Sequence, residues 1–475
     1  MLLAELSPVV EPHLMSLAPG ALAFVLAIVT RRTIEPLLAA VALGLLLIGF
    51  AAPSEPVPGV IGQLEGALDA FCESLLRVLA DDVIRWIILV CGLFGSLIQV
   101  QTITGGAEAI GNLLARYVRG PRGVLLSSWL LGVLIFVDDY LNALTVGSTM
   151  RRLADRYRVS RAMLAYVVDS TAAPICVLIP ASTWALYVSG LLEAERIAAP
   201  GEGLSLYISL LGTFVYAWMA ALLVLLVAAT GWPLLGPMRH EEQAAQSATP
   251  AVPTAAGTDG LTNDASWRAI LTFILPLVVV LGGVLMLDTS DGNRVLKGVL
   301  VGLAIAILLG RVLTGVSFAD LGDAALEGFA RITPALAIVV ISFVLRDVNQ
   351  LLGLTEYLLA TAKPYLNAGL LPAVAFLGLS LVTFTIGSFW GMYAVALPIV
   401  IPLAEQTGAN VGLSIGAVVS AGAFGSHACF YGDATVLTST SCEVSNMTHA
   451  LTQLPYALVA ATISFFIYLA WGLLT

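Results

Sequence analysis

Four aspartates of this chain lie within or directly behind apolar segments, where a carboxylate is costly. Asp138 and Asp139 close the apolar run GVLLSSWLLGVLI in the stretch FVDDYLNALTVGS. Asp169 lies in VVDSTAAPICVLIPAST, and Asp433 lies in GSHACFYGDATVLTSTSC. Because a charge at the centre of a bilayer costs roughly 3 kcal/mol or more on insertion scales, buried acids of this kind usually mark the path of an ion.

Hydroxyl and amide side chains accompany these acids in polar clusters. Pro174 and Pro180 interrupt the cluster around Asp169, and an unwound turn there would expose backbone carbonyls. Carbonyls, hydroxyls and a carboxylate are the ligands that a hard cation such as Na⁺ requires. The candidate ion- or substrate-binding residues are Asp138, Asp139, Asn142, Asp169, Ser170, Thr171, Ser182, Thr385, Ser388, Asp433, Thr435 and Ser439. Among them, Asp139, Asp169 and Asp433 are the candidate Na⁺ ligands.

Each candidate also has a plainer interpretation. Asp138 or Asp139 can cap the half-helix that follows it, and hydroxyls in membrane helices often bond only their own backbone. For Asp169 and Asp433 a function is favoured, because DST and DAT are predicted to lie at equivalent places in two repeats. His427 titrates in the physiological range and is a candidate proton relay or sensor, with a hydrogen-bonded structural histidine as the equal alternative.

The composition places these residues in a membrane protein. The chain has 475 residues, of which 59% are hydrophobic and only 11% are charged, and its mean hydropathy is +0.96. A soluble protein carries roughly a quarter of charged residues. Long apolar runs along the whole chain predict an all-α polytopic protein. We expect it in the plasma (inner) membrane of a bacterium, in contact with the lipid bilayer and without a nucleic-acid partner.

Ten apolar segments predict spanning helices. They cover residues 15–31, 36–52, 83–101, 162–195, 204–231, 268–287, 296–311, 332–348, 409–446 and 454–474. Two further segments, 121–150 and 369–402, are too long for one span, and polar residues or glycine interrupt each of them near its middle.

Arginines explain the first of these two segments. RRLADRYRVSR at 151–161 carries five arginines and RYVRGPR at 116–122 carries three, so the positive-inside rule places both on the cytoplasmic side. The chain between them then enters and leaves by the same face, which predicts a re-entrant hairpin with DDYLNAL near its tip. Two short full spans with an unusual charge distribution are the alternative.

The two halves of the chain resemble each other. GALDAFCESL at 66–75 recurs as AALEGFARIT at 324–333, and LIFVDDYLNALTVGS matches VTFTIGSFWGMYAVA at 382–396. The predicted loops 54–82 and 311–331 differ in charge bias. So do the Arg-rich loop and its counterpart PLAEQTGANVG at 402–412, which holds no Lys or Arg and one Glu. Opposite bias in equivalent loops is what inverted repeats predict, and such repeats with broken helices mark secondary transporters.

The predicted architecture is therefore two inverted five-helix repeats, each with one re-entrant hairpin and one broken helix. The first repeat covers 1–232, with its hairpin at about 121–150 and its broken helix at about 162–195; the second covers 267–475, with its hairpin at about 369–402 and its broken helix at about 409–446. The polar, Pro/Ala/Thr-rich stretch 233–266 predicts a flexible cytoplasmic linker. Both termini are predicted outside.

The stretch FVDDYLNALTVGSTMRRLADRYRVSRAMLAYVVDSTAAPICVLIPASTWALYVSGL resembles the NhaC family of sodium/proton antiporters, as does the later GAFGSHACFYGDATVLTSTSC…THALTQLPYALVAATIS. That family belongs to the ion transporter superfamily, so the resemblance implies a homodimer whose transport domain moves like an elevator against a fixed scaffold. It assigns Asp138, Asp139 and Asn142 to the site of the first hairpin, Asp169, Ser170, Thr171 and Ser182 to the broken helix, and Asp433, Thr435 and Ser439 to the second half. Ser426 departs from the family pattern, because members often carry an acidic residue just before this histidine.

A Na⁺/H⁺ antiporter is the leading functional interpretation, with Na⁺ and H⁺ competing for one or more aspartates as transported or coupling ions. A sodium- or proton-coupled carrier or exchanger of a small organic solute, such as a carboxylate or an amino acid, is the alternative, which GSFWGM in the second hairpin favours slightly. Arg346, the basic residue nearest to the core, is followed by Asp347, which argues against a dicarboxylate. We expect no enzyme activity and no cofactor, because the chain has no HExxH, no CxxC and no serine nucleophile in a GxSxG elbow. A channel is disfavoured, since inverted units with paired hairpins indicate alternating access.

Overall fold

The structure, a computed structural model, describes residues 13–30, 32, 34–51, 60–194, 196–247, 267–286, 294–354, 356–357, 361, 367–387 and 389–475. This part of the chain is helical throughout and contains no strand, as the composition predicted. The first half consists of η1 (Leu14–Leu17), α1 (Ala18–Thr30), α2 (Ile34–Ala51), α3 (Val60–Ala80), α4 (Asp82–Ile103), α5 (Gly106–Tyr117), α6 (Pro121–Leu134), α7 (Asp139–Arg156), α8 (Arg161–Leu178), α9 (Thr183–Ala194), α10 (Gly203–Leu210), η2 (Leu211–Thr213), α11 (Val215–Thr230) and α12 (Met238–Ser247). The second half consists of α13 (Trp267–Met286), α14 (Arg294–Leu309), η3 (Gly310–Thr314), α15 (Phe318–Leu351), α17 (Leu371–Ile386), α18 (Phe389–Thr407), α19 (Val411–Ala428), α20 (Asp433–Cys442) and α21 (Asn446–Leu474).

Six helical segments of the described chain are long and apolar enough to cross a membrane. They are Ile84–Ile103, Arg161–Glu193, Val295–Thr314, Phe318–Leu351, Val411–Cys442 and Asn446–Leu474. A seventh span results if α10–η2 and α11, which meet at 59°, count as one bent helix. All ten predicted spans are helical, but α1, α2 and α13 contribute only shorter apolar stretches.

Two segments that the sequence analysis treated as charged loops are helices. The predicted outer loop 54–82 contains α3, and the predicted inner loop 311–331 contains the first turns of α15. The loop prediction was wrong because an amphipathic helix can carry many charges on one face while its other face packs against neighbours. α3 does so against α2, α4 and α15.

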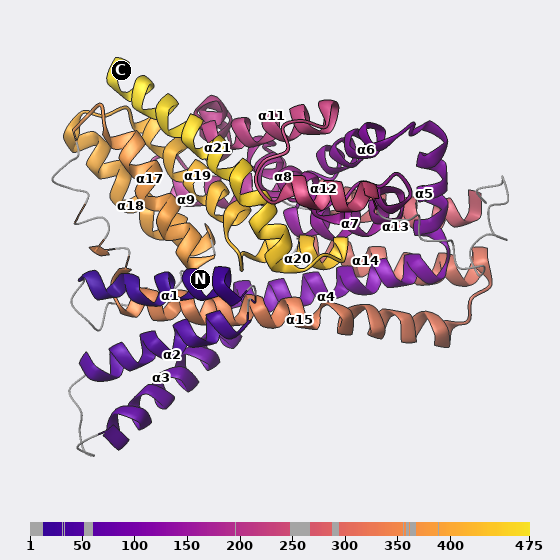
Figure 1. Ribbon diagram of the computed structural model, residues 1–475, viewed down its shortest axis with the longest axis horizontal. Helices are drawn as coiled ribbons and strands as arrows, with labels where there is room; N and C mark the ends of the chain where they lie inside the picture. Colours follow the sequence, from indigo (N-terminus) through magenta and orange to yellow (C-terminus); the bar gives the residue numbers. More distant parts are fainter. Residues whose placement is uncertain are drawn as a thin grey trace.

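The long helices α4 and α15 lie side by side, with α14 against α4 (Figure 1). Glycine permits the close approach, because a Cβ atom added at Gly95 would lie 2.6 Å from the Gly328 carbonyl oxygen. Small residues at such crossings let membrane helices pack through their backbones. α2 and α3 extend from one end of this pair, and α17, α18, α19 and α21 lie together on the other side of the molecule.

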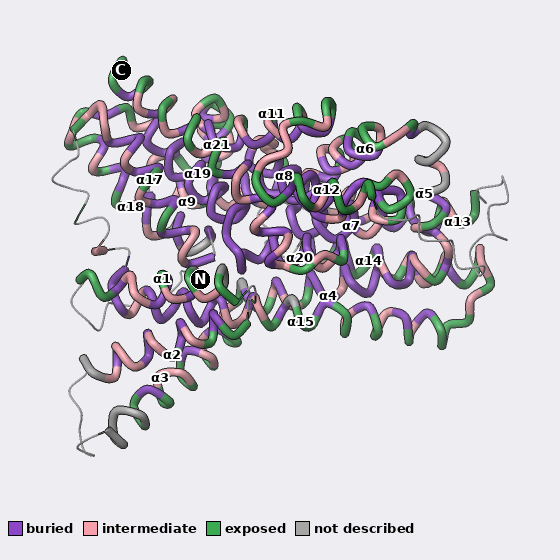
Figure 2. Tube along the Cα trace, in the orientation of Figure 1, coloured by how far each residue is buried: buried purple, intermediate pink, exposed green. Residues whose placement is uncertain are grey.

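Two broken helices form the buried centre of the protein. α8 and α9 are separated by residues 179–182, where Pro180 cannot continue the backbone ladder, and α19 and α20 are separated by residues 429–432. In the apolar 18-residue stretch that qualifies each span, 94% and 100% of the residues are buried, whereas 28% are buried in that of α21 (Figure 2). Pro174, in contrast, is accommodated inside α8.

Both predicted hairpins have a helix–break–helix structure. α6 and α7 flank residues 135–138, and α17 ends at Gly387, whose φ of 72° favours glycine. The re-entrant course of these segments and the inverted repeats remain predictions.

The start of the predicted flexible linker is a helix. α12 packs against α8, and its Glu242 is buried there. The main-chain N–H of Ser160 donates to the Glu242 carboxylate at 2.8 Å. The remainder of the predicted linker, 248–266, lies outside the described residues.

Candidate functional site

Asp169 is the centre of a polar cluster in which α8, α20 and α21 meet. It is fully buried in the middle of α8. Its Oδ2 accepts hydrogen bonds from Gln453 Nε2 at 2.7 Å and from Thr435 Oγ1 at 3.2 Å, and it lies 3.1 Å from His449 Nε2. Among the described residues, Oδ1 has no hydrogen-bond partner. One oxygen of the Asp169 carboxylate is therefore hydrogen-bonded, whereas the other is not.

His427, the predicted proton relay, has both ring nitrogens engaged. Nε2 lies 2.8 Å from Ser170 Oγ, and Nδ1 lies 2.7 Å from Tyr216 OH. The His427 main-chain carbonyl accepts a hydrogen bond from Gln453. This arrangement fits the plainer interpretation of a hydrogen-bonded structural histidine, placed beside the Asp169 cluster.

Asp138 caps α7, as the plainer interpretation of its position predicts. One carboxylate oxygen accepts the main-chain N–H groups of Tyr140 and Leu141, both at 3.1 Å. The other accepts the Thr183 hydroxyl at 3.2 Å. Asp138 thereby joins the start of α7 to the start of α9, because Thr183 also donates its main-chain N–H to the Val137 carbonyl at 2.9 Å.

Asp139 is the first residue of α7 and is fully buried. Its electrostatic neighbours are Asp138, Asp433 and the Trp184 indole. That Asp139 is a Na⁺ ligand therefore stays a prediction.

Asp433 connects α20 to α7. Its Oδ2 accepts the Tyr140 hydroxyl at 2.5 Å, and its Oδ1 accepts the main-chain N–H of Ala434 at 2.8 Å. Ser439, further along α20, donates to the Val436 carbonyl at 2.8 Å. Both carboxylate oxygens of Asp433 are therefore engaged.

Asp169 and Asp433 do not occupy equivalent places in their broken helices, so this part of the repeat prediction was wrong. Asp433 is the first residue of α20, and the first residue of α9 is Thr183. Asp169 lies well before the break, within α8. The short match of DST with DAT suggested an equivalence that the positions of the breaks do not support.

Asn142 holds the first hairpin to the first broken helix. Its Nδ2 lies within hydrogen-bonding distance of the carbonyls of Gly132, Ile135 and Thr171, at 2.7, 3.2 and 2.9 Å. α6 and α8 are in close contact here, because a Cβ atom added at Gly132 would lie 2.1 Å from Thr171 Oγ1. Asn142 thereby connects α7 to α6 and α8.

The side-chain hydroxyls of three other candidate residues form hydrogen bonds only with the backbone. The Thr171 hydroxyl donates to its own helix, and Ser182 caps α9 by accepting the Ala185 N–H at 3.1 Å. Thr385 donates to the Leu381 carbonyl and packs against Gly20 of α1. Ser388 lies outside the described residues.

His449 and Gln453 were not predicted as site residues, although both contact Asp169. The signal was their spacing, since residues four apart on one apolar helix face the same neighbour. Within the described chain, no group of three or more His, Cys, Asp or Glu side chains is arranged to hold a metal ion. Asp139, Asp169 and Asp433 are therefore not gathered into one such group.

Arg346 is buried in α15 and forms an ion-pair cluster. Its guanidinium lies 2.8 Å from the Asp347 carboxylate and 3.5 Å from that of Asp81, and it stacks over the Phe343 ring at 4.5 Å. Asp347, which follows Arg346 in the sequence, is thus one of its ion-pair partners. The guanidinium is thus compensated by carboxylates of the chain itself.

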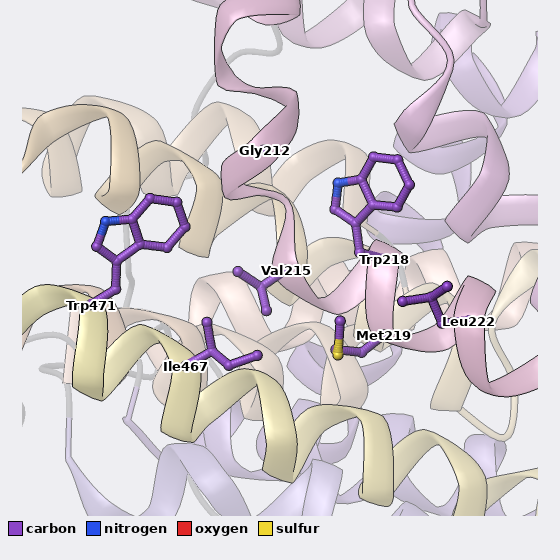
Figure 3. A pocket seen from close by; sticks show the side chains of 7 residues that line it. All are labelled: Gly212, Val215, Trp218, Met219, Leu222, Ile467 and Trp471. Carbon is purple, nitrogen blue, oxygen red and sulfur yellow. The ribbon is translucent and has the colours of Figure 1, made fainter.

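An apolar pocket of about 300 Å³ lies away from these aspartates, between α11 and α21 (Figure 3). Trp218 and Trp471 flank it, and both are partly exposed. The lining residues are Gly212, Val215, Trp218, Met219, Leu222, Ile467 and Trp471. This lining offers no charged group for an ion.

Comparison with known proteins adds three similarities. A family model for the Na⁺/H⁺ antiporter family matches residues 197–473. An uncharacterized protein of Haemophilus influenzae (strain ATCC 51907 / DSM 11121 / KW20 / Rd) is 27% identical over 489 residues, which cover 96% of this chain and 90% of that protein. The crystal structure of the Alcanivorax borkumensis YdaH transporter, reported to have an unusual topology, is similar with a TM-score of 0.41 and 14% identity, over 95% of this chain and 98% of that chain.

Proposed function

The chain belongs to the Na⁺/H⁺ antiporter family, and from this premise we propose that it exchanges Na⁺ for H⁺ across a bacterial inner membrane. Its long apolar helices make it a multi-pass membrane protein, and its family is one of transporters rather than enzymes.

The observation that carries the proposal is the buried carboxylate of Asp169. Its Oδ2 is held by donors, whereas its Oδ1 is bare. A single negative charge can be neutralised by one Na⁺ or by one H⁺, and neutralisation by both at once would leave an uncompensated positive charge in a low-dielectric environment. Competition for one carboxylate is therefore sufficient to couple the two ions.

Access to the site belongs to the same proposal. Alternating access requires elements that rearrange around a fixed binding site, and broken helices near the middle of the membrane are such elements in secondary transporters. α8–α9 and α19–α20 would then carry the ion, with a homodimer and an elevator-like movement implied by the family resemblance.

The structure offers no observation that favours an organic carboxylate as the substrate. Arg346, the buried guanidinium, already pairs with Asp81 and Asp347. A free carboxylate would have to displace one of these partners and leave it buried and unpaired.

Reconstitution into liposomes that contain a pH-sensitive dye tests the proposed function. Na⁺, Li⁺, K⁺ and a panel of carboxylates and amino acids are added in turn at constant ionic strength. Proton flux on addition of Na⁺ alone is the expected result. Flux that requires an organic solute would replace Na⁺/H⁺ exchange with solute transport.

A further inference from the structure

Four unpartnered oxygen atoms lie on residues of one cluster around Asp169. On the basis of the Na⁺/H⁺ exchange proposed above, we propose that they form the subsite that holds the transported Na⁺. The ligands are Asp169 Oδ1, Ser426 Oγ, Thr438 Oγ1 and Gln453 Oε1.

The first argument is the lack of hydrogen-bond partners. All four side chains are at most 1% exposed, and none of the four oxygen atoms has a hydrogen-bond partner in the part of the chain that the structure describes. Buried polar atoms are paired in the great majority of cases, and each unpaired one calls for an explanation. Four of them in one cluster are explained together by a ligand that accepts electron pairs.

Hydrogen bonds hold these residues together in one cluster. Gln453 donates to Asp169 through Nε2 at 2.7 Å, which leaves Oε1 as the other atom of the same amide. Thr435 Oγ1 lies 3.2 Å from both Asp169 Oδ2 and the Ser426 carbonyl oxygen, so α8, α19 and α20 meet at this hydroxyl.

The helical geometry of α20 places Thr438 in the same cluster. Thr435 contacts Asp169, and Cys442 is within electrostatic range of the same carboxylate. Residues three and four apart lie on one helix face, so Thr438 lies between these two positions on the face that looks toward Asp169.

The third argument is the match between donor set and ion. One carboxylate and three neutral oxygens carry a charge of −1, which neutralises one monovalent cation. A divalent cation in an oxygen site is usually held by more than one carboxylate. Asp433 is the nearest further acid on α20, and both of its oxygens are already engaged by Tyr140 and Ala434.

Isothermal titration of NaCl into the purified full-length protein tests the subsite, with choline chloride keeping the ionic strength constant. Thr438→Val and Ser426→Ala each remove one ligand oxygen, and we expect each to raise the Kd for Na⁺ about tenfold, the equivalent of one charge-assisted contact. Thr452→Val is the matched control, because the Thr452 hydroxyl donates to the Thr448 and His449 carbonyls of its own helix. Its Kd should equal that of the wild type.

A conservative variant separates a lost ligand from a lost fold. Thr438→Ser keeps the hydroxyl, and it should bind Na⁺ within about twofold of the wild type, well short of the tenfold loss expected for valine. Wild-type Kd values for Thr438→Val and Ser426→Ala, or a serine variant as weak as the valine variant, would overturn the subsite. If Asp169→Asn alone then abolishes the heat of Na⁺ binding, Na⁺/H⁺ exchange at Asp169 stands without this ligand set. A wild type that gives no heat with Na⁺ would overturn both proposals.

Discussion

At the scale of single residues, the hydroxyl of Tyr140 and the carboxylate of Asp433 form a buried bond between α7 and α20, with an O···O distance of 2.5 Å. Tyr140→Phe keeps the ring but leaves Asp433 Oδ2 without this donor. A buried acceptor that loses its partner costs about 1–3 kcal/mol, so we expect a lower midpoint of thermal unfolding in detergent.

A double-mutant cycle isolates this bond. Tyr140→Phe combined with Asp433→Asn should destabilise by less than the sum of the two single changes, because the bond is lost only once. Additive effects on the free energy of unfolding would show that the two side chains act independently.

Residue types were easier to predict from the sequence than their partners. The cost of a carboxylate in lipid pointed to Asp138, Asp139, Asp169 and Asp433, and all four are buried. The partners of Asp169, in contrast, come from α20 and α21, more than 260 positions further along the chain. No local pattern identifies such pairings, and so His449 and Gln453 were missed.

At the scale of elements, the packing of α6 against α8 depends on glycine. A Cβ atom at Gly132 would lie 2.1 Å from Thr171 Oγ1, so Gly132→Ala must separate the two helices. Overpacking of this kind costs typically about 1–3 kcal/mol, and the thermal midpoint should fall accordingly. Gly378→Ala in α17 is the control, because a Cβ atom there meets nothing within 4 Å. Equal midpoints for the two variants would contradict the close contact.

α12 provides a prediction about pH. Burial raises the pKa of Glu242 from its ordinary value of 4.5, against the opposing effect of its hydrogen bond from Ser160. The docked helix therefore prefers the protonated acid. Its stabilisation is complete below the ordinary pKa and is lost as the pH rises through the raised value.

Hydrogen exchange measures this effect directly. The amides of residues 238–247 should lose protection between acidic and neutral pH, after correction for the intrinsic exchange rate. Glu242→Gln stays neutral and should make the protection independent of pH. The same pH response in this variant would rule out Glu242 as its source.

Apolar runs predicted the helices well, because apolar length alone decides which segments lie in the membrane. Breaks were predicted where Pro180 and the residues around Asp138 interrupt such runs, and the structure has breaks at both places. α3 and the first turns of α15 were predicted as loops, because the charged residues of an amphipathic helix lower its mean hydropathy below that of a spanning segment.

At the scale of the whole molecule, several contacts mark one face as the arginine-rich one. Arg151 and Arg161 pair with Glu443 at 2.6 and 2.8 Å, and the guanidinium of Arg158 donates to the Gln246 carbonyl of α12. From the positive-inside rule we predict that this face is cytoplasmic. α21 begins just after Glu443 and has 29 residues, so it extends roughly 44 Å away at 1.5 Å per residue.

The carboxyl terminus should therefore lie on the outer side of the membrane. Alkaline phosphatase, which is active only outside the cytoplasm, should be active when fused after Thr475, and a fluorescent protein fused there should stay dark. The reverse pattern would contradict the predicted orientation of α21 and, with it, the inverted second repeat.

The central claim is that Na⁺ and H⁺ compete for the buried carboxylate of Asp169. Uptake of radioactive Na⁺ into proteoliposomes, driven by an outward proton gradient, measures this exchange most directly. We predict rapid uptake by the wild-type protein, and uptake at the level of protein-free liposomes by Asp169→Asn, although the variant is folded and inserted. Full uptake by Asp169→Asn would contradict the claim.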